Sequence, residues 1–303
     1  MDTRWFRRFD EALPDAPRLI CFPHAGGSAS VYAPLARLLS GPLEVLAVQY
    51  PGRQDRRTEA PATSVTDLAA RIAERLEAGG VTGERPYAFF GHSMGALVAY
   101  ESARALQSRS APAPARLFLS GRSAPGPRPD RHDRLHDDAA ILAAVRALGG
   151  TDASVLDDPE LVDMVMPALR ADYGALASYA WRPGPALNAP LTALVGDSDP
   201  VVPVASVSGW ARHTTGDDEV LVFAGGHFYL TERLHDVGAV VADRLRALTG
   251  GASGIQDSGP AGSDGGRTDT GTGGPQAARG PRTAAAAGEP GGRHQRTAGR
   301  ALA

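Results

Sequence analysis

Short, continuously apolar runs alternate along the chain with longer amphipathic ones. Apolar runs bounded by Gly, Pro or Asp predict strands at Arg18–Phe22, Glu44–Gln49, Tyr87–Gly91, Ala115–Ser120, Leu191–Val195 and Glu219–Phe223. Longer segments with the apolar spacing of a helix that buries one face are Val65–Ala78, Ser93–Gln107 and Thr231–Leu248. Strands without a polar face that alternate with helices are typical of a covered parallel sheet, so we predict a doubly wound α/β sheet.

The stretch 123–189 interrupts this alternation. It has helix signals but no strand pattern: Asp137 precedes an apolar-rich segment at 139–148, and Asp158-Pro159 is a typical helix start. A helical insertion placed just before a strand can cover the crevice at the carboxyl ends of a parallel sheet. We therefore expect a helical lid over about 123–189.

Composition divides the chain near Gly250. Hydrophobic residues are 43% of the whole chain, but residues 250–303 are rich in Gly, Ala, Pro and Arg and lack apolar anchors. Burial in such a segment cannot offset its ordering entropy. We expect one domain at 1–249 and a disordered tail at 250–303.

Charge and cysteine content exclude several classes of protein. The formal net charge is −3, which provides no cationic field for nucleic acid or an anionic membrane. Cys21 is the single cysteine, so an internal disulfide and a cysteine-based zinc cluster are excluded. The chain has no apolar run of about 18 residues, and its first residues lack the apolar core of a secretory signal. We expect a cytoplasmic protein.

The strongest chemical signal is Gly91-His92-Ser93-Met94-Gly95, the one G-x-S-x-G in the chain. It lies between a predicted buried strand and a predicted helix. At such a strand–turn–helix corner a serine is held in a strained conformation with its hydroxyl exposed, and flanking glycines avoid clashes. Ser93 is therefore the candidate nucleophile.

A serine hydroxyl needs a neighbouring base, and in this type of sheet the partners follow in the order Ser, Asp or Glu, His. Of the four histidines that lie beyond the acidic candidates, only His227 follows a predicted strand, after a glycine pair that lets the backbone turn. His213 and His235 lie in polar helical stretches, where we expect solvated side chains, and His294 lies in the tail. His227 is the candidate base.

The acid is expected on a loop after an earlier strand. The strand Leu191–Val195 is followed by Asp197 and Asp199, and spacing does not choose between them. The chosen carboxylate would orient the imidazole of the base. We expect the other aspartate to form a turn by bonding its own backbone.

A tetrahedral intermediate needs two hydrogen-bond donors for its oxyanion. One is expected from the backbone N–H of Met94, directly after the nucleophile. The other is expected from the Gly-rich loop 23–28, which follows the strand Arg18–Phe22. We expect His24 to brace this loop rather than to act as a second base.

Four further stretches accompany the serine corner: Cys-Phe-Pro-His-Ala-Gly-Gly-Ser at 21–28, Tyr-Pro-Gly-Arg at 50–53, Gly-Asp-Ser-Asp-Pro at 196–200 and Gly-Gly-His-Phe at 225–228. Together they resemble the free-standing type II thioesterases of polyketide and nonribosomal peptide biosynthesis. The resemblance covers about residues 5–248.

This resemblance implies an α/β-hydrolase fold with a helical lid. It implies hydrolysis of acyl thioesters held on the phosphopantetheine arm of acyl or peptidyl carrier proteins, an editing reaction that needs no metal and no cofactor. It also implies that Asp199 is the acid, and that Ala25 and Met94 supply the oxyanion donors. We expect a monomer without nucleic-acid or membrane partners.

Other functions remain compatible with the same residues. A carboxylesterase or lipase passes through the same intermediate with an oxygen ester, and an acyltransferase replaces water with an alcohol or amine. A non-catalytic binding protein of the same fold is a further alternative. The residues alone do not separate these functions.

Overall fold

A computed structural model describes residues 2–249 apart from residues 84, 128–129, 136 and 151–155. One sheet contains seven strands in the order β1-β3-β2-β4-β5-β6-β7. Their bounds are β1 Phe6–Arg8, β2 Arg18–Phe22, β3 Glu44–Val48, β4 Tyr87–His92, β5 Leu117–Ser120, β6 Leu191–Gly196 and β7 Asp218–Phe223. All neighbours pair in parallel except β1, which pairs antiparallel with β3. The predicted fold class is confirmed; the short strand β1 was not predicted.

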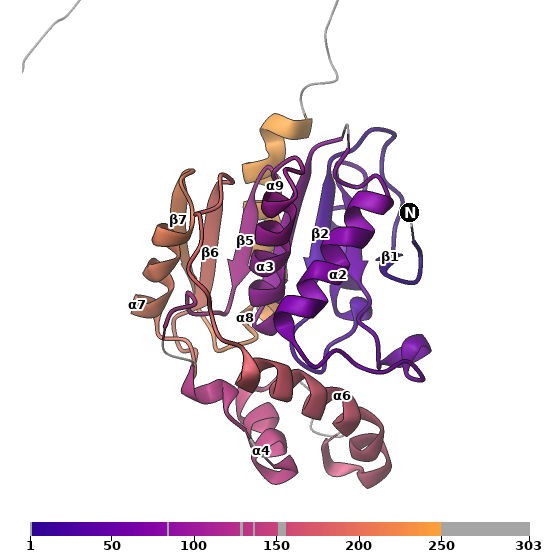
Figure 1. Cartoon of the computed structure of the whole chain (residues 1–303), viewed down its shortest axis with the longest axis vertical. Helices are drawn as coiled ribbons and strands as arrows, with labels where there is room; N and C mark the ends of the chain where they lie inside the picture. The colour runs from indigo at the N-terminus through magenta and orange to yellow at the C-terminus, as the bar shows by residue number, and fades with distance from the viewer. Residues whose placement is uncertain (1, 84, 128–129, 136, 151–155, 250–303) are drawn as a thin grey trace, which may run out of the picture. The chain divides into compact units, whose positions relative to one another are not determined.

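Helices cover both faces of the sheet (Figure 1). The α-helices among the described residues are α1 Ala33–Leu38, α2 Val65–Ala78, α3 Met94–Ser108, α4 Asp138–Leu148, α6 Pro159–Ser178, α7 Val204–Val207, α8 Tyr229–Glu232 and α9 Leu234–Thr249. Helices α2 and α3 pack on one face, and α1 and α9 pack on the other. The helix predicted at Thr231–Leu248 is in fact two, because the chain turns between α8 and α9.

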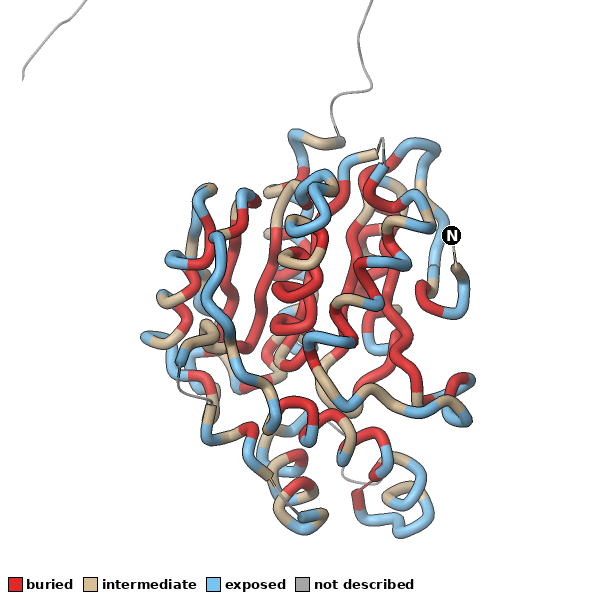
Figure 2. The backbone as a smooth tube through the Cα atoms, in the orientation of Figure 1, coloured by how far each residue is buried: buried red, intermediate tan, exposed pale blue. Residues whose placement is uncertain are grey.

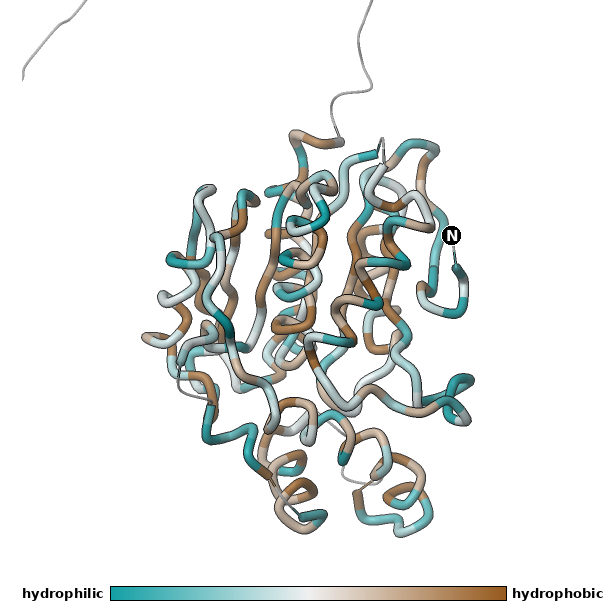
Figure 3. The backbone as a smooth tube through the Cα atoms, in the orientation of Figure 1, coloured by the Kyte–Doolittle hydropathy of each residue, from teal (hydrophilic) through white to brown (hydrophobic). Residues whose placement is uncertain are grey.

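The core lies on both sides of the central strands, which are buried along their length (Figure 2). Along α2, the buried side chains Leu68, Ile72 and Leu76 form one apolar stripe, and the opposite face is exposed. Figure 3 shows the same pattern as hydropathy, with the most apolar segments in the sheet. The buried strands explain why continuous apolar runs predicted them.

The insertion forms helices beside one end of the sheet, where α4 and α6 lie apart from the layers that cover its faces (Figure 1). Both begin as predicted: the Asp137 carboxylate accepts the N–H of Ala140 (2.8 Å), and that of Asp158 accepts the N–H of Glu160 (2.9 Å). The predicted tail at 250–303 lies outside the described residues. Among the described residues, no helix has both the length and the apolar character to cross a bilayer.

Candidate active site

The serine corner joins β4 to α3. Ser93 has φ 55° and ψ −120°, a strained conformation for a residue with a side chain, and its N–H donates to the carbonyl of Ser120 on β5 (2.8 Å). A Cβ added to Gly91 would overlap the carbonyl oxygen of Gly95, and one added to Gly95 would overlap that of Phe22. The corner therefore requires glycine at both flanking positions.

His227 and Asp199 meet across two loops, one after β7 and the other after β6. Nδ1 of His227 lies 2.7 Å from Oδ2 of Asp199, and these side chains are 2% and 0% exposed. Oδ1 of Asp199 accepts the N–H groups of Val201 (2.9 Å) and Val202 (3.0 Å). Because the carboxylate accepts from Nδ1–H, it assigns the tautomer in which Nε2 is available as a base.

Asp197 makes a different set of contacts. Its Oδ1 accepts the N–H of Gly225 (3.0 Å) and the hydroxyl of Ser198 (2.7 Å). The Gly225 N–H is also the main cause that lowers the pKa of Asp197 below its usual range. The local backbone contact predicted for the second aspartate is present as well, because the backbone N–H of Ser198 also contributes to lowering this pKa. Asp197 joins the loop after β6 to the loop that carries His227.

One cavity of about 450 Å³ brings the candidate residues together, since Ala25, Ser93 and His227 all line it. The Ser93 hydroxyl has no hydrogen-bond partner among the described residues. Side chains of the insertion provide much of the apolar wall, namely Leu135, Ala144, Ala147, Leu148 and Leu176. The serine and the imidazole thus face one largely apolar chamber, and Asp199 contacts the imidazole without lining the chamber itself.

The loop 23–28 is held by side chains from the Tyr-Pro-Gly-Arg stretch. The Tyr50 hydroxyl donates to the carbonyl of Pro23 (3.1 Å), and Nη1 of Arg53 donates to that of Gly27 (2.7 Å). The backbone N–H groups of Ala25 and Met94 donate to no described residue. Both remain available as donors at this end of the sheet.

Two further histidines lie near His227. The His92 ring is buried, its centroid is 5.0 Å from that of His227, and its Nδ1 lies 2.9 Å from the Ser120 hydroxyl. Burial holds the pKa of His92 well below its usual value. His24 makes no side-chain hydrogen bond with the described residues; its ring packs edge-on against Phe228, with centroids 4.8 Å apart. Its bracing contact is therefore an aromatic one.

The prediction of a solvated His213 was wrong. The side chain is buried, with Nδ1 2.9 Å from the Tyr100 hydroxyl and Nε2 3.0 Å from the carbonyl of Pro125. Aromatic rings of Trp181 and Trp210 pack around it. His213 therefore connects α3 to the segment around Pro125 through its two ring nitrogens.

Two buried ion pairs near the site were not predicted as pairs. Arg53 bonds Asp172 of α6, and Arg122 bonds Asp133 in the cavity wall (2.8 Å). A signal for Asp172 was present, because this charged residue lies among the apolar positions of α6 beside Leu169. Its partner could not be found from the sequence, since Arg53 is 119 residues away.

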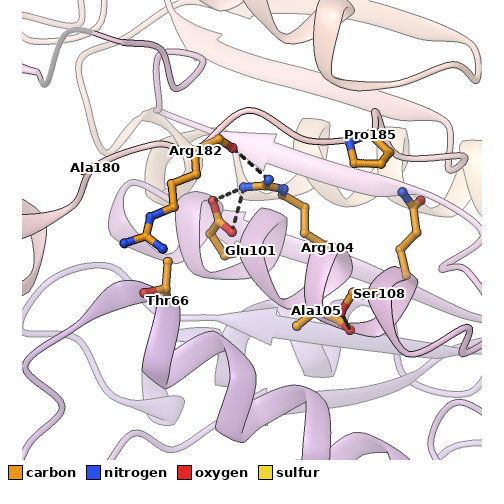
Figure 4. A pocket seen from close by; sticks show the side chains of 9 residues that line it. Thr66, Glu101, Arg104, Ala105, Ser108, Ala180, Arg182 and Pro185 are labelled. Atoms are coloured by element: carbon orange, nitrogen blue, oxygen red, sulfur yellow. Dashed lines mark hydrogen bonds and ion pairs between the residues drawn. The ribbon is translucent and has the colours of Figure 1, made fainter.

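A second cavity, of about 400 Å³, lies beside α3 (Figure 4). Its lining includes Thr66, Glu101, Arg104 and Arg182. Arg104 bonds the Glu101 carboxylate (3.0 Å) and the Arg182 carbonyl (2.8 Å), and none of the candidate catalytic residues lines this space. Among the described residues, no group of three or more His, Cys, Asp or Glu is arranged to hold a metal ion.

Comparisons with known proteins agree with this geometry. The family model of the thioesterase domain matches residues 17–247. The chain is 46% identical over 246 residues to the thioesterase PikA5 of Streptomyces venezuelae, covering 81% of this chain and 87% of that protein. It is similar to the solved type II thioesterase BorB from the borrelidin cluster (44% identity, TM-score 0.73, 80% and 98% coverage). It is also similar to RedJ from Streptomyces coelicolor (38% identity, TM-score 0.72, 78% and 89% coverage).

Proposed function

The chain belongs to the thioesterase family, and from this premise we propose that it hydrolyses acyl thioesters on the phosphopantetheine arm of acyl or peptidyl carrier proteins. It does so as a free-standing type II enzyme that clears unwanted acyl groups from a polyketide or nonribosomal peptide synthase. The observation that carries this proposal is the 2.7 Å contact of Asp199 with His227, whose side chain lines the same cavity as strained Ser93.

In the first half of the reaction, Oγ of Ser93 attacks the thioester carbonyl carbon while Nε2 of His227 accepts the hydroxyl proton. Asp199 stabilises the imidazolium that forms, through the bond to Nδ1. The C–S bond then breaks, and His227 returns the proton to the departing pantetheine thiol. A thiol, with a pKa near 8.5, needs less help from an acid than an amine would.

The negative charge of the tetrahedral intermediate requires donors that are in place beforehand. The N–H of Met94 follows Ser93 at the start of α3, and the N–H of Ala25 lies on the loop that faces the same cavity. We assign the oxyanion site to these two groups. Side-chain changes at Ala25 would leave its donor in place.

In the second half, a water molecule attacks the acyl-enzyme carbonyl and gives a proton to His227. The C–O bond to Ser93 breaks, Ser93 recovers the proton, and the free acid leaves. Both halves use the same residues in reversed roles, so one site completes the cycle.

The insertion forms the acyl chamber in this proposal. Helices α4 and α6 provide apolar side chains to the cavity that contains Ser93. The hydrolase domain then extends over residues 1–249, and its lid over about 123–189. We expect the lid to open for the pantetheine arm and to close on the acyl chain.

The test is release of the thiol from an acyl-loaded carrier protein, measured for short, branched and long acyl groups. We expect Ser93→Ala to lose at least about 10⁴-fold in kcat and to remain folded. Ser108→Ala is the matched control, because it makes the same change at the far end of the same helix. Full turnover by Ser93→Ala would show that the nucleophile is misassigned.

A matched oxygen ester, assayed beside the carrier-bound thioester, tests the esterase alternative. Faster cleavage of the oxygen ester would favour it. Transfer of the acyl group to an added alcohol or amine, in place of hydrolysis, would favour an acyltransferase.

A further inference from the structure

A buried ion pair connects the lid to the loop 23–28. Nη2 of Arg53 donates to Oδ1 of Asp172 (2.7 Å), and Nη1 donates to Oδ2 (2.9 Å), so the guanidinium and the carboxylate meet side by side. The two side chains are 5% and 3% exposed. Such a two-point contact fixes orientation as well as distance.

The same pair also bonds the backbone of the two residues that follow Ala25. Oδ2 of Asp172 accepts the N–H of Gly26 (2.7 Å), and Nη1 of Arg53 donates to the carbonyl of Gly27 (2.7 Å). The peptide between Ala25 and Gly26 is therefore oriented by a carboxylate of helix α6. The sheet does not supply this contact.

Helix α6 also packs against the loop. Gly26 has φ +74°, and a Cβ added there would lie 2.5 Å from Cδ2 of Leu169, three residues before Asp172 on α6. Leu169 and Asp172 thus contact Gly26 from one turn of the helix. The shape of the loop depends on that turn being seated.

Stability alone is a weak explanation for this pair. Charges that leave water lose hydration, and a well-packed apolar pair is often as stable as a buried ion pair. Arg53 also has a buried Nε with no partner among the described residues, which adds to the cost. The oriented contacts to Gly26 and Gly27 are what an apolar pair could not provide.

We propose that Asp172 and Arg53 are positioning residues that aim the Ala25 N–H at the reacting carbonyl, so that the lid helix completes the oxyanion site. This inference rests on the proposed function. As a consequence, the Ala25 N–H is oriented for the oxyanion only when α6 is packed against the loop 23–28. A lid that is displaced leaves the enzyme with the Met94 donor alone.

Single substitutions provide the first test. Asp172→Asn keeps the volume but loses the charge, and Arg53→Lys keeps the charge but loses the two-point contact. We expect kcat for an acyl-loaded carrier protein to fall about 100-fold in Asp172→Asn, because a shift of about 1 Å at a reacting group has that effect. We expect KM to stay unchanged. Arg53→Lys should show a smaller loss of kcat in the same direction.

Arg170→Gln is the matched control. Arg170 lies two residues from Asp172 on α6 and pairs with Asp138 at the surface (2.7 Å), away from the loop. This variant removes an ion pair from the same helix but should keep wild-type kcat. A loss equal to that of Asp172→Asn would assign the effect to the helix as a whole and overturn the proposal.

A second readout separates positioning from folding. An alkyl boronic acid forms a tetrahedral adduct with Ser93 and places an oxygen in the oxyanion site, whereas a thioether analogue of the substrate does not. We expect Asp172→Asn to weaken the boronate in proportion to its loss of kcat and to leave thioether affinity unchanged. Equal weakening of both ligands would indicate a merely structural role.

The double variant Arg53→Met/Asp172→Leu covers the case in which a single variant does not fold. It replaces the pair with apolar side chains of similar volume, so we expect the fold to be retained and kcat to be lost. Wild-type kcat in the double variant would overturn the inference. Ser93→Ala, assayed in parallel, distinguishes failure of the proposed function from failure of the positioning role. If Ser93→Ala remains active, the proposed function fails. If Ser93→Ala is inactive while the Asp172 variants keep wild-type kcat, only the positioning role fails.

Discussion

The proposed catalytic trio (Ser93, Asp199 and His227) and the loop 23–28 lie at the same end of the sheet, but they are held in different ways. The trio follows β4, β6 and β7, and bonds within and between the adjacent turns keep each residue in place. The loop is held by side chains from other segments, including one from the lid. The trio is thus held by the sheet and its turns, whereas the loop, although it directly follows β2, is held by distant partners.

This difference separates two kinds of dependence. A change in the lid should leave the trio in position, because none of its described hydrogen bonds reaches α4 or α6. The same change should alter the loop, because Asp172 and Leu169 contact it. The lid would therefore affect oxyanion stabilisation more than nucleophile activation.

The largest expected effect is within the trio. Asp199→Asn should lower kcat about 10⁴-fold, because an amide stabilises the wrong imidazole tautomer and no longer supports the imidazolium. Asp197→Asn is the matched control on the same turn, and we expect a loss of less than about 10-fold, since it braces Gly225 without contacting the ring. Steady-state kinetics with an acyl-loaded carrier protein measure both. Equal losses of kcat in the two variants would mean that the trio also depends on the contact of Asp197 with Gly225.

The next effect concerns the loop. Gly26→Ala should lower kcat about 10- to 100-fold, because its Cβ would press on Leu169 at a left-handed φ and displace the adjacent donor. Gly80→Ala is the control: it has a similar φ of +64° but open space around it, so it should cost only about 1–2 kcal/mol of stability. If both variants kept wild-type kcat, activity would not depend on the contact between the loop and α6. The proposed difference between the loop and the trio would then be wrong.

A smaller effect tests the lid wall directly. Ala144→Leu adds bulk to the cavity from α4, and we expect about a 10-fold loss of kcat/KM for the longest acyl group accepted, with short groups unaffected. Ala143→Leu, on the exposed side of the same helix, should leave the profile unchanged. A uniform loss over all chain lengths would show that the lid also acts on the trio.

The smallest effect is on stability and concerns His92 behind the trio. Its pKa is below its usual value of about 6.5, so the unfolded chain binds a proton that the folded chain does not. The free energy of unfolding should thus fall as pH drops below about 6.5, by up to about 1.4 kcal/mol per pH unit from this group. Urea titrations between pH 8 and pH 5 should show a shallower fall in His92→Gln. His235→Gln, at an exposed site, should keep the wild-type slope.

The sheet and the corner could be predicted because their signals are local. The buried run before Ser93, the glycines on either side of it, and the aspartates that cap α4 and α6 act over a few residues. β1 was missed because a three-residue edge strand has too little pattern to stand out. The prediction that His213 is solvated was wrong because its neighbours in sequence are polar, whereas its partners in space are Tyr100 and two tryptophans.

The sequence by itself determined the doubly wound sheet, the strained serine and the loop that carries His227, since apolar periodicity and glycine placement decide these over short stretches. Only the tertiary structure decided which aspartate lies against the imidazole, because Asp197 and Asp199 share one turn and their side chains leave it in different directions. It also decided that Asp172 meets Arg53, a contact across 119 residues that depends on where the lid packs. Side-chain direction and long-range packing are set by the whole fold.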